Sequence, residues 1–160
     1  MNARFRSVAI IIGIVILDRI TKIYIERNYS PWDSTPVIAG FFNIVHAENP
    51  GAAFNFLTDS TSPWRGVFLI GVSLVVMAIM GFMLFRPGVK KSTLLEIALA
   101  MVFGGAAGNL WDRLFRGTVT DFLQLFFGSY EFPSFNVADS AISIGACLLL
   151  IDLWKNRAKT

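Results

Sequence analysis

Residues 66–85 read GVFLIGVSLVVMAIMGFMLF and contain no charged side chain. A run of this kind is long enough to cross the ~30 Å hydrocarbon core of a bilayer as a helix, which takes about 20 residues. The whole chain has a matching composition, because 54% of its 160 residues are apolar and 16% are charged. Soluble domains carry about 25% charged residues. We therefore expect an integral membrane protein, with no separate soluble domain and no nucleic-acid partner.

Three further apolar runs, 7–17, 98–107 and 140–151, accompany this one. With their flanking residues, the runs predict an all-α membrane protein of four transmembrane helices that forms a single domain over residues 1–160. The helices are expected at about 7–27, 64–85, 93–111 and 138–155. The first run also resembles the apolar part of a secretory signal peptide. No small-residue cleavage site follows it, however, so we favour a retained helix.

The positions of Lys and Arg predict how these helices are oriented, because basic residues in short loops favour the cytoplasmic side. With four spans, three basic groups fall on one side: Arg4 and Arg6; Arg86, Lys90 and Lys91; Lys155, Arg157 and Lys159. Both termini are therefore expected in the cytoplasm. The longer segments, at about 28–63 and 112–137, are then extracytoplasmic.

The first of these segments has the composition of a small sheet. Residues 36–57, PVIAGFFNIVHAENPGAAFNFL, are rich in β-branched and aromatic side chains. Asn49-Pro50-Gly51 provides turn residues within them, since Pro presets one backbone dihedral and Gly accepts a positive φ. We expect a hairpin or small sheet around this turn, on the outer surface of the membrane.

Polar residues interrupt the apolar runs at one level, on the extracytoplasmic side. The inner halves of the helices are apolar apart from Glu96 and Asp152. Ionisable groups at membrane depth are costly and usually face a cavity or one another, so they suggest a functional site. The residues at this level are Asp18, Arg19 and Lys22 in the first helix, Asn109, Asp112 and Arg113 in the third, and Asn136 and Asp139 at the start of the fourth.

Several of these residues also have a purely structural interpretation. Asp18 and Lys22 are four apart on one helix face, and an ion pair between them is the favoured interpretation. Asp112 and Arg116 have the same spacing and suit a solvated pair. Asp139 suits the N-cap of the fourth helix, because Asp accepts hydrogen bonds from free backbone N–H groups.

Arg113 and two glycines have structural interpretations of the same kind. The long side chain of Arg113 is able to reach the membrane interface beside Trp111. Gly104 and Gly108 form a small-xxx-small face that predicts close helix packing. Such packing would place Asn109 near the neighbouring helices.

Asp121 is harder to explain structurally. It lies in GTVTDFLQLFF, where Val119, Asp121, Leu123 and Leu125 share one face of an extended strand. A carboxylate on an apolar face needs compensating groups or a raised pKa. Asp121 and Asp139 are therefore the two candidates for a shared site. A metal site is not expected, since His46 is the single histidine.

Four motifs resemble those of the lipoprotein signal peptidase (signal peptidase II) family and follow one another in the family's order. They are LDRITK (17–22), ENPGAAF (48–54), GNLWDR with VTDF (108–113 and 119–122) and FNVAD (135–139). The resemblance covers nearly the whole chain. One position departs from the pattern, because the family usually has Gln where Arg19 stands.

The resemblance implies an aspartic endopeptidase of the bacterial inner membrane with an extracytoplasmic active site. Such an enzyme removes the signal peptide from diacylglyceryl-modified prolipoproteins, cutting before the modified cysteine. It implies a small extracytoplasmic sheet that cradles the site, and it implies no cofactor. The protein is expected to be a monomer. Membrane lipids and cyclic peptide antibiotics such as globomycin are its further expected partners. By motif position, the catalytic pair is Asp121 and Asp139, the site-shaping residues are Asn49, Gly51, Asn109, Arg113 and Asn136, and the supports are Asp18 and Lys22.

Two other functions remain as alternatives. Intramembrane carboxylates also serve proton-coupled transporters and channels. The apolar inner halves of the helices argue against these, because they offer no continuous polar path. A non-catalytic membrane adaptor with a structural polar cluster is the second alternative.

Overall fold

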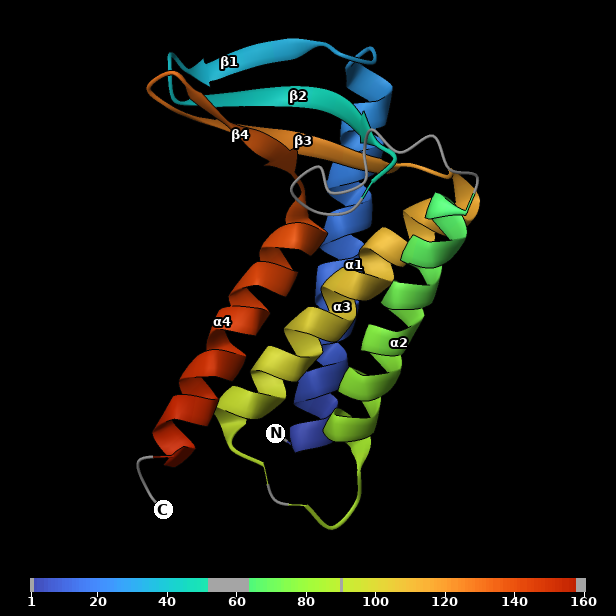
Figure 1. The fold of residues 1–160 in the computed structure, drawn as a ribbon, viewed down its shortest axis with the longest axis vertical. Helices are drawn as coiled ribbons and strands as arrows, with labels where there is room; N and C mark the ends of the chain where they lie inside the picture. The colour runs from blue at the N-terminus through green and yellow to red at the C-terminus, as the bar shows by residue number, and fades with distance from the viewer. Residues whose placement is uncertain (1, 52–63, 90, 158–160) are drawn as a thin grey trace.

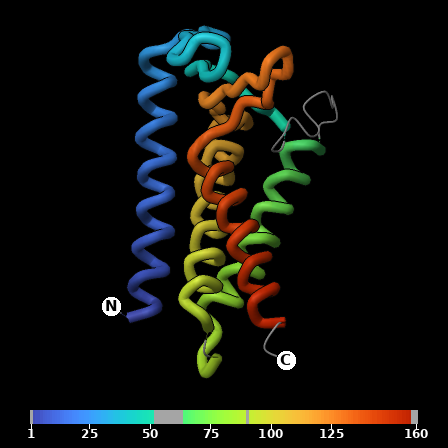
Figure 2. Tube along the Cα trace, turned by 90° about the vertical axis from the view of Figure 1, so that its left-hand side faces the viewer, coloured from blue at the N-terminus to red at the C-terminus, as the bar shows by residue number. Residues whose placement is uncertain are grey.

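In the part of the chain that the structure describes, four long helices stand side by side, and a four-stranded antiparallel sheet lies across one end of them (Figure 1). The computed structural model describes residues 2–51, 64–89 and 91–157, so residues 52–54 of the ENPGAAF motif lie outside the described part. The helix starting at residue 3 and the helix ending at residue 157 both have those ends away from the sheet (Figure 2). In chain order the elements are α1 (Ala3–Asn28), β1 (Ser34–Ile38), β2 (Phe42–Asn49), α2 (Arg65–Phe85), α3 (Thr93–Phe115), β3 (Val119–Phe127), β4 (Tyr130–Phe135) and α4 (Val137–Arg157).

The helices have the composition and surface of a membrane protein. In the part of the chain that the structure describes, α2, α3 and α4 are long and apolar enough to cross a bilayer, with mean hydropathies of 2.7, 1.5 and 1.7 over their best windows. The accompanying α1 has 26 residues. Its Asp18 and Lys22 are fully buried, while Ile12, Ile16 and Ile20 are exposed. Asp18 and Lys22 therefore face the bundle, and these three isoleucines face outward.

α3 packs against each of the other three helices, and small residues let them approach closely. A Cβ atom added to Gly104 would lie 3.3 Å from the Cα of Ile11 in α1, and one added to Gly105 would lie 2.4 Å from the carbonyl oxygen of Ala138 in α4. At Gly108 the added atom would meet a carboxylate oxygen of Asp18 at 2.7 Å. The close packing predicted from Gly104 and Gly108 is thus confirmed.

α3 continues one turn past the end expected at about residue 111, and its last residue is Phe115. Asp112 is therefore inside the helix, where it is fully buried and paired with cations from α1. Burying an unpaired carboxylate is costly, and this cost favours ending a helix at the membrane surface. Here the cations from α1 compensate for that cost. Gly117, with φ of 80°, then turns the chain into β3.

The sheet has the strand order β1-β2-β3-β4, and every pairing is antiparallel. The β1–β2 hairpin turns at Gly40, whose φ is 72°, and not at Asn49-Pro50-Gly51 as the sequence suggested. Gly40 accepts the left-handed conformation without strain, so the tight reversal forms there. Asn49 instead ends β2, where it pairs with Val119 at the start of β3.

Polar pairs also lie at the end of the bundle away from the sheet. Arg6 of α1 forms an ion pair with Glu96 of α3. The hydroxyl of Ser92 caps α3 by accepting a hydrogen bond from the N–H of Leu95 at 2.9 Å, and it donates one to Asp152 of α4. These contacts account for the two charged residues in the otherwise apolar inner halves of the helices.

Candidate active site

Asp121 and Asp139 come together where the sheet meets the helix ends. Asp121 belongs to β3 and is 1% exposed, whereas Asp139 lies in the first turn of α4 and is half-buried. Asn136 joins the two: its Nδ2 donates to Oδ1 of Asp121 at 2.7 Å, and its backbone N–H donates to Oδ2 of Asp139 at 3.2 Å. One residue between the strand and the helix therefore holds both carboxyl groups.

The start of α4 explains why Asp139 points to this place. The N–H of Asp139 donates to Oδ1 of Asn136 at 2.9 Å, while the Asp139 carboxylate accepts the N–H of Asn136. This reciprocal arrangement is a capping box, which satisfies two backbone donors at once. The interpretation of Asp139 as the N-cap was therefore wrong: Asn136 is the cap, because it immediately precedes the helix, and Asp139 is its partner in the first turn.

Two further asparagines complete a set of donors to the carboxylates. Nδ2 of Asn49 donates to Oδ2 of Asp121 at 2.9 Å, and Nδ2 of Asn109 donates to Oδ1 of Asp139 at 2.7 Å. Together with the two bonds from Asn136, each of the four carboxylate oxygens accepts an N–H group.

These surroundings alter the ionisation of Asp121. Burial raises its pKa to about 7, and the nearby charge of Asp139 contributes in the same direction. The hydrogen bonds from Asn49 and Asn136 oppose this rise, because they stabilise the charged form. A carboxyl group with such a pKa is able to hold a proton beside an ionised neighbour, which is the arrangement that activates water in acid–base catalysis.

Arg113 secures the segment that follows β2. Its guanidinium donates to the carbonyl oxygen of Gly51 at 2.8 Å, and the N–H of Gly51 donates to Oδ1 of Asn49 at 2.8 Å. Arg113 is half-buried and turned toward the site, so it does not extend to the interface beside Trp111 as one interpretation proposed. The reason is that the Gly51 carbonyl offers its charge a partner within the protein.

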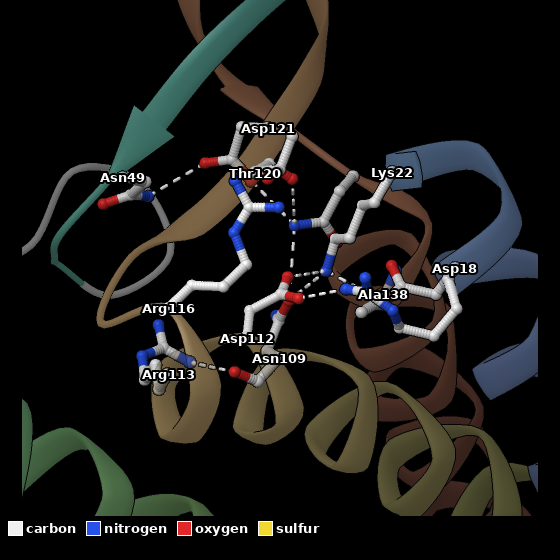
Figure 3. Close-up of polar contacts among 12 residues, drawn as sticks. Asp18, Lys22, Asn49, Asn109, Asp112, Arg113, Arg116, Thr120, Asp121 and Ala138 are labelled. Atoms are coloured by element: carbon white, nitrogen blue, oxygen red, sulfur yellow. Dashed lines mark hydrogen bonds and ion pairs between the residues drawn. The ribbon is translucent and has the colours of Figure 1, made fainter. Parts of the chain in front are cut away.

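Lys22 lies at the centre of a second group of polar residues, below Asp121 in Figure 3. Its ammonium group contacts Oδ2 of Asp18 at 2.8 Å, Oδ2 of Asp112 at 2.8 Å and Oδ1 of Asn109 at 3.0 Å. The predicted Asp18–Lys22 pair is confirmed. Asp18 also accepts the backbone N–H of Ala138 at 3.0 Å, so α1 helps to cap α4.

The expected Asp112–Arg116 pair is not formed. Asp112 is turned toward α1 and also pairs with Arg19, while Arg116 forms an ion pair with Glu26. The sequence contained a signal for the contact of Asp112 with α1, because Asp112 is three residues from Asn109 and shares its helix face. The roles of Glu26, and of Thr120, which donates to it, were not predicted.

Apolar cavities open on two sides of Asp139. One, of about 520 Å³, lies between β3, β4 and α4, and its walls include Leu125, Phe132 and Ile142. The other, of about 170 Å³, lies among α2, α3 and α4 and is also bordered by Asn109. The carboxyl group is thus next to surfaces suited to apolar ligands.

Known proteins resemble this chain over most of its length. Residues 10–155 match the family described as signal peptidase (SPase) II. A lipoprotein signal peptidase of Solibacter usitatus is 45% identical over 95% of this chain and 92% of its own length. Another, from Maridesulfovibrio salexigens, is 40% identical over 98% of this chain and its whole length.

Solved structures resemble the fold as closely. A bacterial membrane enzyme determined by the in meso method at 2.3 Å resolution matches with a TM-score of 0.86 and 31% identity, covering 97% of this chain and 91% of that one. The four motifs, the fold and these relatives agree, and the chain belongs to the signal peptidase II family.

Proposed function

We propose that this protein is an aspartic endopeptidase that removes signal peptides from diacylglyceryl-modified prolipoproteins, with Asp121 and Asp139 as its catalytic pair. Family membership supports the activity, since the relatives in two other bacteria are lipoprotein signal peptidases. The observation that carries the residue assignment is the junction at Asn136, which hydrogen-bonds both carboxyl groups.

The chemistry follows from two carboxyl groups that share one proton. Two carboxyl groups this close do not both ionise readily, so one carboxyl group of the pair is protonated and the other is ionised. The ionised carboxylate takes a proton from water as the water attacks the scissile carbonyl carbon. The protonated member donates a hydrogen bond to the developing oxyanion, and the pair then returns a proton to the leaving amine. No cofactor enters any of these steps.

The substrate class fits the surroundings of Asp139. A lipid-modified precursor brings acyl chains and an apolar signal helix, and both need apolar surfaces beside the scissile bond. The cavities of about 520 and 170 Å³ that meet at Asp139 offer such surfaces on two sides. Cyclic peptide antibiotics that act on this family are expected to occupy the same region.

We place four membrane spans in the chain as one domain, with both termini in the cytoplasm and the sheet on the extracytoplasmic side of the inner membrane. The exposed Ile12, Ile16 and Ile20 of α1 support its inclusion with the three more apolar helices. Arg86 and Lys91 follow α2 at the end away from the sheet, as cytoplasmic loops require.

A cleavage assay tests this proposal. Detergent-purified protein is incubated with a diacylglyceryl-modified precursor and, separately, with the unmodified precursor. The wild-type protein should cleave only the modified one. Asp121→Asn and Asp139→Asn should each abolish cleavage while the protein still folds, as shown by its thermal unfolding. Substantial turnover by either folded variant would rule out the pair, and a folded wild-type protein that fails to cleave the modified precursor would support the adaptor or transporter interpretation of the polar cluster.

A further inference from the structure

The three asparagines around the carboxylates are all turned the same way, with Nδ2 toward a carboxylate. The partner of the oxygen atom at the other end of each amide explains this orientation. Oδ1 of Asn49 faces the N–H of Gly51, and Oδ1 of Asn136 faces the N–H of Asp139. Oδ1 of Asn109 faces the ammonium group of Lys22 at 3.0 Å and also accepts a longer hydrogen bond, of 3.3 Å, from Nδ2 of Asn136.

Each of these oxygen partners is able only to donate a hydrogen bond, never to accept one. A flipped amide would place its NH₂ group against another donor and its oxygen against a carboxylate. Both contacts would be repulsive, so the chemistry of the partners fixes the orientation. For Asn49 and Asn136 that partner is part of the local backbone. For Asn109 the nearer partner is a side chain from another helix, Lys22, which a mutation is able to remove.

The residues around Lys22 hold its ammonium group at this contact. The residue is fully buried, and an ammonium group has three N–H donors. Two of them face the carboxylates of Asp18 and Asp112, and the third faces Asn109. Asp18 and Asp112 each also accept from another group, namely the N–H of Ala138 and the guanidinium of Arg19. The ammonium position is therefore fixed from α1, α3 and, through Ala138, α4.

We propose that Lys22 is a positioning residue for the peptidase reaction, because its ammonium group holds the Asn109 amide in the orientation that donates a hydrogen bond to Asp139. The inference rests on the proposed function, since it assigns a task within the same site. Lys22 itself makes no contact with either Asp121 or Asp139 among the contacts of the described residues, and it acts through Asn109.

The consequence concerns the ionised form of the carboxyl pair. A hydrogen bond to a carboxylate favours its charged form, so losing the Asn109 donor makes that form harder to reach. The acidic limb of the pH–rate profile should then move to higher pH. The charged groups on the surrounding helices that act on the pair are Lys22 of α1 and Arg113 of α3, and Asp18 and Asp112 form ion pairs with Lys22.

A double-mutant cycle separates this role from a simple effect of charge. Lys22→Met, Asn109→Ala and the double variant are compared with the wild-type enzyme in kcat, KM and pH–rate profile, using the diacylglyceryl-modified precursor. Each single variant should lower kcat by about tenfold to a hundredfold, the range for one hydrogen bond to a charged group, with little change in KM. The double variant should be no slower than Asn109→Ala, and its acidic limb should lie at the same pH.

Additive effects in the cycle would overturn the proposal, because a charge effect of Lys22 on the pair does not need Asn109. If Lys22→Met fails to fold, Asn109→Asp tests the donor on which the proposal depends. It keeps the ammonium group and its acceptor, removes the NH₂ group and adds a negative charge beside Asp139, so its kcat should fall at least as far as in Asn109→Ala and its acidic limb should move to higher pH. Wild-type kinetics in Asn109→Asp would refute the proposal.

Two controls keep the inference separate from the function on which it rests. Glu96→Gln breaks an ion pair at the far end of the bundle and should leave kcat and the pH profile unchanged. Turnover by Asp121→Asn or Asp139→Asn would refute the catalytic pair itself. Inactivity of those variants with an additive Lys22–Asn109 cycle would refute only the positioning role.

Discussion

The crossing of α3 and α4 at Gly105 provides a sharp test of how the bundle positions the site. A Cβ atom at this position would lie 2.4 Å from the carbonyl oxygen of Ala138 and 2.8 Å from Cγ1 of Ile142. The first distance is about 1 Å short of the 3.4 Å at which ordinary contacts begin. The obstacle is backbone, so Gly105→Ala must push the start of α4 away from α3.

The displacement has an expected cost in both stability and activity. Overpacking of this kind costs about 1–3 kcal/mol in unfolding free energy, of which the better helix propensity of Ala restores up to about 1 kcal/mol. Ala138 directly precedes Asp139, so the shift moves a carboxyl group of the proposed catalytic pair. A misplacement of about 1 Å is enough to reduce kcat about a hundredfold.

Gly71→Ala is the matched control, because the same substitution in α2 meets no atom within 4 Å. Both variants are purified in detergent, unfolded by heat and assayed on the modified precursor. We expect Gly71→Ala to behave like the wild type or to be slightly more stable, and Gly105→Ala to be less stable and much slower. If the two variants unfold at the same temperature and cleave equally well, the α3–α4 crossing does not determine the position of Asp139.

Three further predictions follow from individual contacts. Because burial raises the pKa of Asp121 to about 7, the folded protein retains a proton that the unfolded chain loses near pH 4. The unfolding free energy should therefore fall as the pH rises from about 4 to above 7. In thermal unfolding, the stability of Asp121→Asn should decline less over the same pH range. Arg113→Gln removes the donor to the Gly51 carbonyl and should lower kcat/KM by about tenfold or more in the cleavage assay, whereas an unchanged value would show that this contact does not hold the site together. Ser92→Ala removes the cap of α3 and should lower the unfolding free energy by about 1 kcal/mol with no change in kcat, since Ser92 lies at the far end of the bundle; a slower enzyme would contradict this separation.

Patterns that depend on neighbours along the chain were predictable. The uncharged run at 66–85 corresponds closely to α2, which spans Arg65–Phe85. Asp18 and Lys22 pair as their spacing on one helix face predicts. The glycines of α3 make close helix contacts, and Val119, Asp121, Leu123 and Leu125 lie in one strand.

Contacts between elements were predicted less well, because competing partners come from other parts of the chain. Asp112 had a plausible partner four residues away in Arg116, yet it pairs with Lys22 and Arg19 of α1, which face it across the helix packing. The sequence indicated the hairpin turn at Asn49-Pro50-Gly51, but the β1–β2 hairpin turns at Gly40, and Asn49 donates a hydrogen bond to Asp121.

By itself the sequence determined the membrane class, the helix positions and the two candidate carboxylates, since hydropathy, charge placement and residue spacing act locally along the chain. The motifs additionally identified the family. Only the tertiary structure decided that Asn136 joins Asp121 to Asp139 and that Lys22 contacts Asn109. Those contacts join residues of α1, α3, β3 and α4, and their geometry depends on how closely the helices pack and how the sheet pairs. No spacing within one segment encodes them.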